Sequence, residues 1–142
     1  MGVQDFEWTC SIRSLDWMLR ATGLNPYSNV VTAAFELGYP SCVDQWSGLK
    51  NTQCLVNALS AYGVEARQEW VAWDRAMELA TTTAVIWNST RWYHFVAGRG
   101  QLDGELIYIA NSAPGYQGIF ETINRAQWEQ WAGSWQAVWL VR

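Results

Sequence analysis

The hydrophobic pattern of this chain changes near residue 64, and that change constrains the fold more than any other feature. Before it, apolar residues recur at helical spacing; after it, β-branched and aromatic residues gather in short runs between turn residues. Helices followed by strands predict an α+β domain, in which helices pack on an antiparallel sheet. We expect residues 1–142 to form a single domain, either alone or cut from a larger protein.

Helices are predicted where apolar residues recur with the period of an α-helix. They are expected at residues 9–21, at residues 30–37, and from Asn51 or Thr52 to Gly63. The first has Thr9 as its N-cap and Gly23 as its stop, residue types that favour these positions. Residues 41–50, between the later two helices, are expected to form a loop.

Strands are predicted where β-branched and aromatic residues cluster. They are expected at residues 64–70, 84–87, 92–99, 105–110, 119–122 and 135–141. Short helices are expected at residues 74–80 and 124–131, capped by Asp74 and Asn124. The pair Asp103-Gly104 favours a tight turn, so a hairpin is expected to join the strands at 92–99 and 105–110.

Charge and hydropathy exclude several classes of function. The net charge of −4 offers nothing to neutralise a phosphate backbone, so no nucleic-acid partner is expected. No apolar run approaches the roughly 20 residues that span a bilayer, so membrane insertion is not expected. Residues 1–7 have neither a basic start nor an apolar core, and therefore predict no signal peptide. The chain is expected to be cytoplasmic as made.

The cysteines and the histidine limit the available chemistry. Three cysteines, an odd number, exclude a complete disulfide framework and leave at least one thiol free or paired with another chain. Cys42 and Cys54 can bridge each other, although nothing in the sequence demands it. With one histidine and no CxxC motif, a structural zinc site is not expected, and no cofactor is implied. His94 is the obvious candidate for acid–base chemistry near neutral pH.

Eleven tryptophans are the unusual feature of the composition. They lie at positions 8, 17, 46, 70, 73, 87, 92, 128, 131, 135 and 139. Large aromatic side chains supply much of the buried area of a small domain, so most of them are expected in the core. The others are candidates to line a groove, where an indole can stack on a sugar ring or hold a peptide side chain.

Cys10 lies where the leading segment turns into the first predicted helix. Backbone N–H groups without partners and the positive end of the helix dipole favour a thiolate at such a position. Because the thiolate is the nucleophilic form of cysteine, Cys10 is the candidate nucleophile. The alternative is that Cys10 is a small buried apolar residue, which is a common role for a free cysteine.

His94 and Asn111 can serve such a nucleophile. Strand alternation places Trp92, His94 and Val96 on one face. The predicted hairpin lets Asn111, at the end of the next strand, lie near the histidine, where its amide oxygen can accept an imidazole N–H and set the tautomer. Considered singly, His94 can equally be a satisfied core or edge residue, and Asn111 can be a residue that caps a turn.

Gln4 lies six residues before Cys10. A side-chain amide near the nucleophile can donate a hydrogen bond to the oxyanion formed during acyl transfer, and the Cys10 backbone N–H can be the second donor. By itself, Gln4 is a polar residue near a chain terminus. As a set, these residues supply an oxyanion donor, a nucleophile, a base and an orienting group.

This order and spacing resemble papain-like cysteine peptidases, particularly the compact bacterial branch that processes double-glycine leader peptides. The resemblance is carried by residues 4–10 with the helix that follows, Gly38-Tyr39-Pro40, Trp92-Tyr93-His94-Phe95-Val96, and residues 109–116. It implies a papain-like fold, with Gln4 as oxyanion donor and Cys10, His94 and Asn111 as a catalytic triad. That branch usually has aspartate where Asn111 stands, whereas the papain type has asparagine, which stabilises an imidazolium less.

The resemblance also implies what such a hydrolase cleaves. Similar domains stand at the front of phage and bacterial cell-wall lytic enzymes, so the stem peptides of peptidoglycan are the first candidate substrate, reached after release of the chain. A protein or leader peptide is the second. Trp8 and Trp92 are candidates to line the substrate groove.

Readings from other classes of protein remain open. One is a non-catalytic module on the same scaffold, whose tryptophans hold a glycan or a peptide. Another is a structural or regulatory protein with an inert buried thiol. Within the enzymes, CHAP-type amidohydrolases also place a cysteine at a helix start and a histidine on a strand, but the spacing from Gln4 to Cys10 favours the papain-like order.

Overall fold

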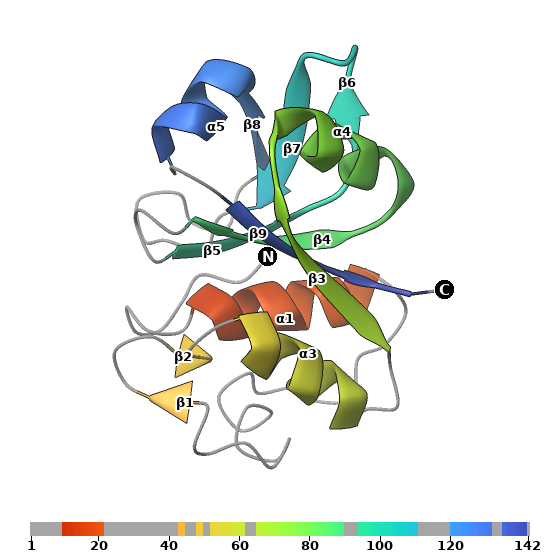
Figure 1. The fold of residues 1–142 in the computed structure, drawn as a ribbon, viewed down its shortest axis with the longest axis vertical. Coiled ribbons are helices and arrows are strands. Elements are labelled where there is room, and N and C mark those ends of the chain that lie inside the picture. The colour runs from red at the N-terminus through yellow and green to blue at the C-terminus, as the bar shows by residue number, and fades with distance from the viewer. Residues whose placement is uncertain are drawn as a thin grey trace.

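The computed structural model describes residues 10–21, 43–44, 48–49, 52–61, 65–89, 94–110, 120–131 and 135–141. Helices lie on both sides of a central sheet. Helices α1 (Cys10–Ala21) and α3 (Thr52–Ala61) lie on one side, and α4 (Trp73–Thr82) and α5 (Arg125–Trp131) lie on the other (Figure 1). This arrangement confirms the prediction of an α+β domain.

The central sheet contains seven of the described strands. Their bounds are β3 (Ala66–Val71), β4 (Val85–Ser89), β5 (His94–Gly98), β6 (Gln101–Leu102), β7 (Leu106–Ala110), β8 (Phe120–Asn124) and β9 (Trp135–Leu140). The order across the sheet is β3-β9-β4-β5-β7-β6, with β8 paired along β7, and the pairs are antiparallel. The last strand of the chain is therefore inserted between β3 and β4.

The two faces of the sheet carry different cores. On the side of α4 and α5, side chains such as Trp87, Val96 and Ala137 are fully or almost fully buried in one cluster. Strand alternation turns the intervening residues, among them Phe95 and Val138, to the side of α1 and α3. Because both faces are covered, β4 is buried along its whole length and β5 is buried from Phe95 to Gly98.

Tryptophans form the centre of the core under α4 and α5. The Trp128 ring stacks on Trp135 at a centroid distance of 4.3 Å and meets Trp73 and Trp87 edge-on at 5.7 and 5.3 Å. The Trp135 indole N–H donates to the backbone carbonyl of Trp128 at 2.8 Å, so its polar atom is satisfied in the interior. The expectation of a tryptophan-rich core is confirmed for these four side chains.

Helix α1 follows the predicted boundaries. It begins at Cys10 and ends at Ala21, while Thr9 and Gly23 lie outside the described residues. Leu15, Met18 and Leu19 are buried at helical spacing, and Arg20 is exposed. The same amphipathic pattern in the sequence predicted the helix.

The loop expected at residues 41–50 contains a small hairpin, so that prediction was wrong in part. Strands β1 (Val43–Asp44) and β2 (Gly48–Leu49) pair antiparallel. Strands this short carry no readable periodicity, and β2 lies against α1 and α3, so tertiary packing rather than local pattern supports them. The helix expected at residues 30–37 lies outside the described residues.

The two predicted helix caps had different outcomes. Asn124 caps α5, because its side-chain oxygen accepts the Gln127 backbone N–H at 2.9 Å while the Gln127 side chain accepts the Asn124 N–H at 2.9 Å. Asp74 does not cap α4. That helix begins at Trp73, its N-cap is Ala72, and Asp74 lies in the first turn, where its charge complements the helix dipole.

The turn at Asp103-Gly104 forms as predicted, but it joins β6 to β7. Both residues have positive φ, 53° and 71°, which is the conformation that an aspartate–glycine turn provides. Gly98, at the end of β5, passes close to β7. A Cβ there would lie 2.1 Å from the Tyr108 carbonyl oxygen, so this position requires glycine.

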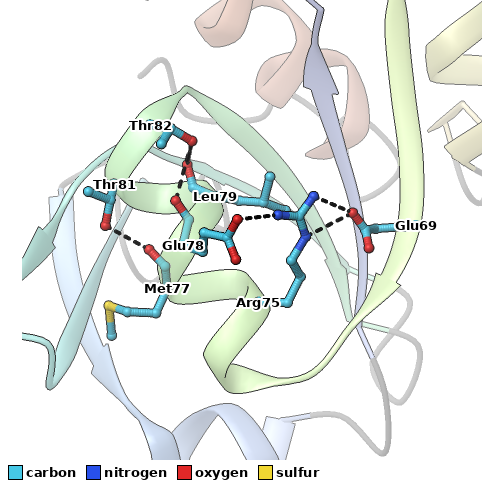
Figure 2. Close-up of polar contacts among 7 residues, drawn as sticks. All are labelled: Glu69, Arg75, Met77, Glu78, Leu79, Thr81 and Thr82. Atoms are coloured by element: carbon cyan, nitrogen blue, oxygen red, sulfur yellow. Dashed lines mark hydrogen bonds and ion pairs between the residues drawn. The ribbon is translucent and has the colours of Figure 1, made fainter.

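Arg75 ties α4 to the edge of the sheet (Figure 2). Its guanidinium donates to Glu69 of β3 at 2.8 and 3.0 Å and to Glu78 at 2.8 Å, and lies 5.6 Å from the centre of the Trp139 ring. Hydrogen bonding to Glu69 is the main cause that raises the pKa of Arg75. An arginine is already charged at every physiological pH, so the raised pKa does not change the charge of Arg75.

Candidate functional site

Cys10 is the first residue of α1, as predicted. The first turn of this helix contains no acidic residue, so nothing there opposes a negative charge at the thiol. Ser14, one turn further along, is fully buried, which shows that this side of the helix packs inward. The Cys10 side chain itself lies outside the described residues.

His94 is the first residue of β5 and is partly buried. The rest of the strand is buried, so the backbone that carries the imidazole is held firmly. Its cross-strand partner is Ser89, and Ser89 in turn pairs with Trp135. A tryptophan and a buried hydroxyl therefore occupy the row of the sheet in which the histidine lies.

The fold brings α1 and β5 together. The most extensive contact of α1 with any described strand is with β5, and it also touches β4 (Figure 1). The helix that begins at Cys10 thus lies against the strand that begins at His94. By alternation His94 shares the face of Val96, opposite to the one that α1 covers, so a pair with Cys10 requires the imidazole to pass around the end of its strand.

Asn111 lies outside the described residues, but the strand that leads to it is described. Ala110, the last residue of β7, pairs with Ala97 of β5. Because these strands are antiparallel, β7 runs toward the His94 end of β5. Gln4, Trp8 and Trp92 also lie outside the described residues. Their roles as oxyanion donor and groove residues stay predictions.

Cys54 is disulfide-bonded and buried, with an exposed fraction of 4%. It lies in the first turn of α3. The chain has two other cysteines, Cys10 and Cys42, and the side chains of both lie outside the described residues. The sequence left open a bridge between Cys42 and Cys54, and that pairing stays a prediction because the partner of Cys54 lies outside the described residues.

A row of polar cross-strand neighbours, not predicted from the sequence, lies on the face of the sheet that α1 and α3 cover. In this row Asn88 donates to the Gln136 side chain at 3.2 Å, and Gln136 pairs in turn with Trp70, which is 59% exposed. The row lies one register position from the row of Ser89 and His94, and by strand alternation on the opposite face of the sheet. No local signal marks it, because the strands it joins are far apart in the chain.

The described residues provide no metal site. Among the side chains in the described part of the chain, no group of three or more histidine, cysteine or acidic residues is placed to hold a metal ion. No helix within the described ranges is long and apolar enough to cross a membrane.

The helices and antiparallel sheet have the architecture of papain-like cysteine peptidase domains. The chain is similar to a double-glycine-motif protease from an AMS/PCAT transporter, solved in complex with the leader peptide, with a TM-score of 0.70 and 19% identity over 99% of this chain and 89% of that one. It is also similar to the peptidase domain of Streptococcus ComA, a bi-functional ABC transporter involved in quorum sensing. That match has a TM-score of 0.72 and 15% identity over 99% of this chain and 96% of the other.

Comparisons by sequence add nothing to this likeness. No protein-family model matches the chain, and no curated protein matches it significantly. The structural neighbours therefore establish the fold, and the predicted papain-like fold class is confirmed.

Proposed function

We propose that the protein is a cysteine peptidase in which Cys10, His94 and Asn111 act as the catalytic triad. The observation that carries the proposal is the packing of a helix that begins at Cys10 against a strand that begins at His94, within the fold of peptidase domains. Nucleophile and base then come from separate, rigid elements, as a cysteine–histidine pair requires.

In this mechanism His94 takes the proton of the Cys10 thiol, and the resulting imidazolium stabilises the Cys10 thiolate. The sulfur attacks the carbonyl carbon of a peptide bond, and the imidazolium then gives its proton to the departing amine. Water, deprotonated by His94, attacks the acyl-enzyme and releases the acid. Each turnover returns both residues to their starting state, so no cofactor is consumed.

Gln4 and Asn111 support the reacting atoms. The Gln4 side chain and the Cys10 backbone N–H donate to the oxyanion of the tetrahedral intermediate. Asn111 accepts the second imidazole N–H of His94 and keeps the other nitrogen turned toward the thiol. The course of β7, which ends beside β5, supports this assignment of Asn111.

A free thiol at Cys10 requires that Cys54 is bonded to Cys42. Cys42 directly precedes β1, whose partner β2 lies against α3, the helix that carries Cys54. Pairing these two residues closes a short loop and leaves Cys10 as the reactive cysteine of the chain.

The substrate we propose is a peptide, and more narrowly the stem peptide of peptidoglycan, cleaved by a phage or bacterial lytic domain. A leader peptide is the alternative substrate. One structural neighbour was solved with a leader peptide, which supports peptide substrates for this fold. Trp8 and Trp92 remain our candidates to line the groove.

The test is the pH dependence of Cys10 alkylation by iodoacetamide, followed by peptide mapping. A Cys10–His94 pair predicts rapid labelling well below the unperturbed thiol pKa of about 8.5, and slower labelling in His94→Ala. Labelling that begins only above this pKa, or only in the unfolded chain, would contradict the pair. Cys10→Ala should abolish cleavage of peptidoglycan while leaving the thermal unfolding transition in place.

A further inference from the structure

Trp70 is the most exposed large apolar side chain among the described residues, at 59%. It lies on β3, an edge strand whose described partner in the sheet is β9. An exposed indole on an edge strand is unusual, because edges are normally protected by charged residues or covered. Gln136 is the cross-strand partner of Trp70, and Gln68, two positions away on β3, bonds to Gln53 of α3, which bonds to Asn57. We call Trp70, Gln68, Gln53, Asn57 and Gln136 together the Trp70 surface.

The Trp70 surface lies on the α1 and α3 face of the sheet. Gln68 bonds to residues of α3, and alternation along β3 puts Trp70 on the same face as Gln68. Trp70 lies two positions beyond Gln68, whose side chain bonds to Thr52 and Gln53 in the first turn of α3. Its row continues through Gln136 and Asn88 to Phe95, the neighbour of His94. The backbone of β3 is thus about 14 Å, or three strand spacings, from that of β5, the strand of the candidate base.

Three amides of the Trp70 surface are linked by hydrogen bonds, and the fourth, Gln136, bonds separately to Asn88. Gln68 accepts from Thr52 and donates to Gln53 at 2.5 Å, and Gln53 donates to Asn57 at 2.9 Å. On the other side of Trp70, Gln136 accepts from Asn88 at 3.2 Å. These contacts hold the amides in fixed orientations while Gln53 and Gln68 remain exposed. A polar network held in this way is preorganised to exchange hydrogen bonds with a ligand.

The surface carries no charge among its described side chains. Helix α3 contains no acidic or basic residue along its whole length, which is uncommon for a helix with exposed positions. On β3 the charged residues Arg67 and Glu69 alternate to the opposite face. A ligand that depends on ion pairs, such as a charged peptide, would find no partner here.

We propose that the Trp70 surface binds an uncharged glycan strand of N-acetylated hexoses. The apolar C–H face of a pyranose ring matches the face of an indole, whose negative quadrupole attracts C–H groups. Hydroxyl and acetamido groups match side-chain amides, which both donate and accept. The link to catalysis rests on the proposed function: the sugar strand binds at Trp70 while an attached peptide reaches the candidate triad. The binding itself does not depend on catalysis.

The test is isothermal titration of the intact chain with the tetramer of N-acetylglucosamine, which carries no stem peptide. We expect saturable binding, weakened about tenfold or more in Trp70→Ala, the effect of removing one stacking aromatic side chain. Trp70→Phe should retain part of the affinity. In ¹⁵N-labelled protein the indole N–H signal that is lost in Trp70→Phe should be the one that shifts most on titration.

Leu102→Ala is the matched control, because Leu102 is also apolar and 41% exposed but lies on β6, at the other end of the sheet. It should bind the tetramer as the native chain does. Absence of saturable binding, equal binding by Trp70→Ala, or an equal loss in Leu102→Ala would each overturn the proposal. Cys10 alkylation is measured separately, so an unreactive thiol with intact tetramer binding would contradict only the peptidase mechanism.

Discussion

Two tryptophans show how the surroundings of a residue, rather than its type, decide its role. Trp128 is 2% exposed and contacts three other indoles, whereas Trp70 is 59% exposed on an edge strand. The sequence predicted that most tryptophans are buried and left the others as candidates to line a groove, without assigning Trp70 or Trp128 to either set. The structure places Trp128 in the core and leaves Trp70 exposed.

This contrast predicts a large loss of stability for one tryptophan-to-alanine substitution and almost none for the other. Trp128→Ala should lower the free energy of unfolding by about 3 to 5 kcal/mol, because it removes a large buried side chain and leaves a cavity among its neighbours. Urea denaturation followed by circular dichroism measures the loss. Trp70→Ala is the matched control and should change stability by less than about 0.5 kcal/mol. Equal losses in the two variants would mean that Trp70 is packed rather than exposed.

At the level of elements, the helix caps show what local sequence can specify. Asn124 and Gln127 exchange hydrogen bonds three positions apart in the sequence, so nearby residues determine where α5 begins. The start of α4 is different. Trp73 belongs to the buried cluster, and packing of its indole places the helix start one residue before the expected cap at Asp74.

Asn124→Ala is therefore expected to lower stability by about 1 kcal/mol, the usual effect of removing an N-cap side chain. Asp74→Ala should lower it less, by about 0.5 kcal/mol, because only a charge near the helix dipole is lost. Thermal unfolding of the two variants beside the native chain gives the comparison. A larger loss in Asp74→Ala would show that Asp74 caps α4 after all.

At the level of the whole molecule, the disulfide at Cys54 joins α3 to a segment outside that helix, and its partner decides whether Cys10 is free. If Cys42 is the partner, Cys42→Ser and Cys54→Ser should each lower stability by about 2 to 4 kcal/mol, and the double variant should lose no more. Cys10→Ser should leave stability nearly unchanged. These values follow from denaturation under non-reducing conditions.

A disulfide between Cys10 and Cys54 would give a different pattern of stability losses. A loss in Cys10→Ser that matches Cys54→Ser, with none in Cys42→Ser, would place Cys10 in the disulfide and remove it as the nucleophile. Peptide mapping of the non-reduced protein identifies the bonded pair independently.

The sequence by itself determined the elements that depend on near neighbours: the amphipathic helix from Cys10, the Asp103-Gly104 turn, the Asn124 cap, and the helix-then-strand order that predicts an α+β fold. It also placed Cys10 at the start of a helix and His94 on a strand. Only the tertiary structure decided that β9 lies between β3 and β4, that α1 packs against β5, and that Trp70, Gln136 and Asn88 are cross-strand neighbours. These arrangements depend on register between strands far apart in the chain, which no local pattern encodes.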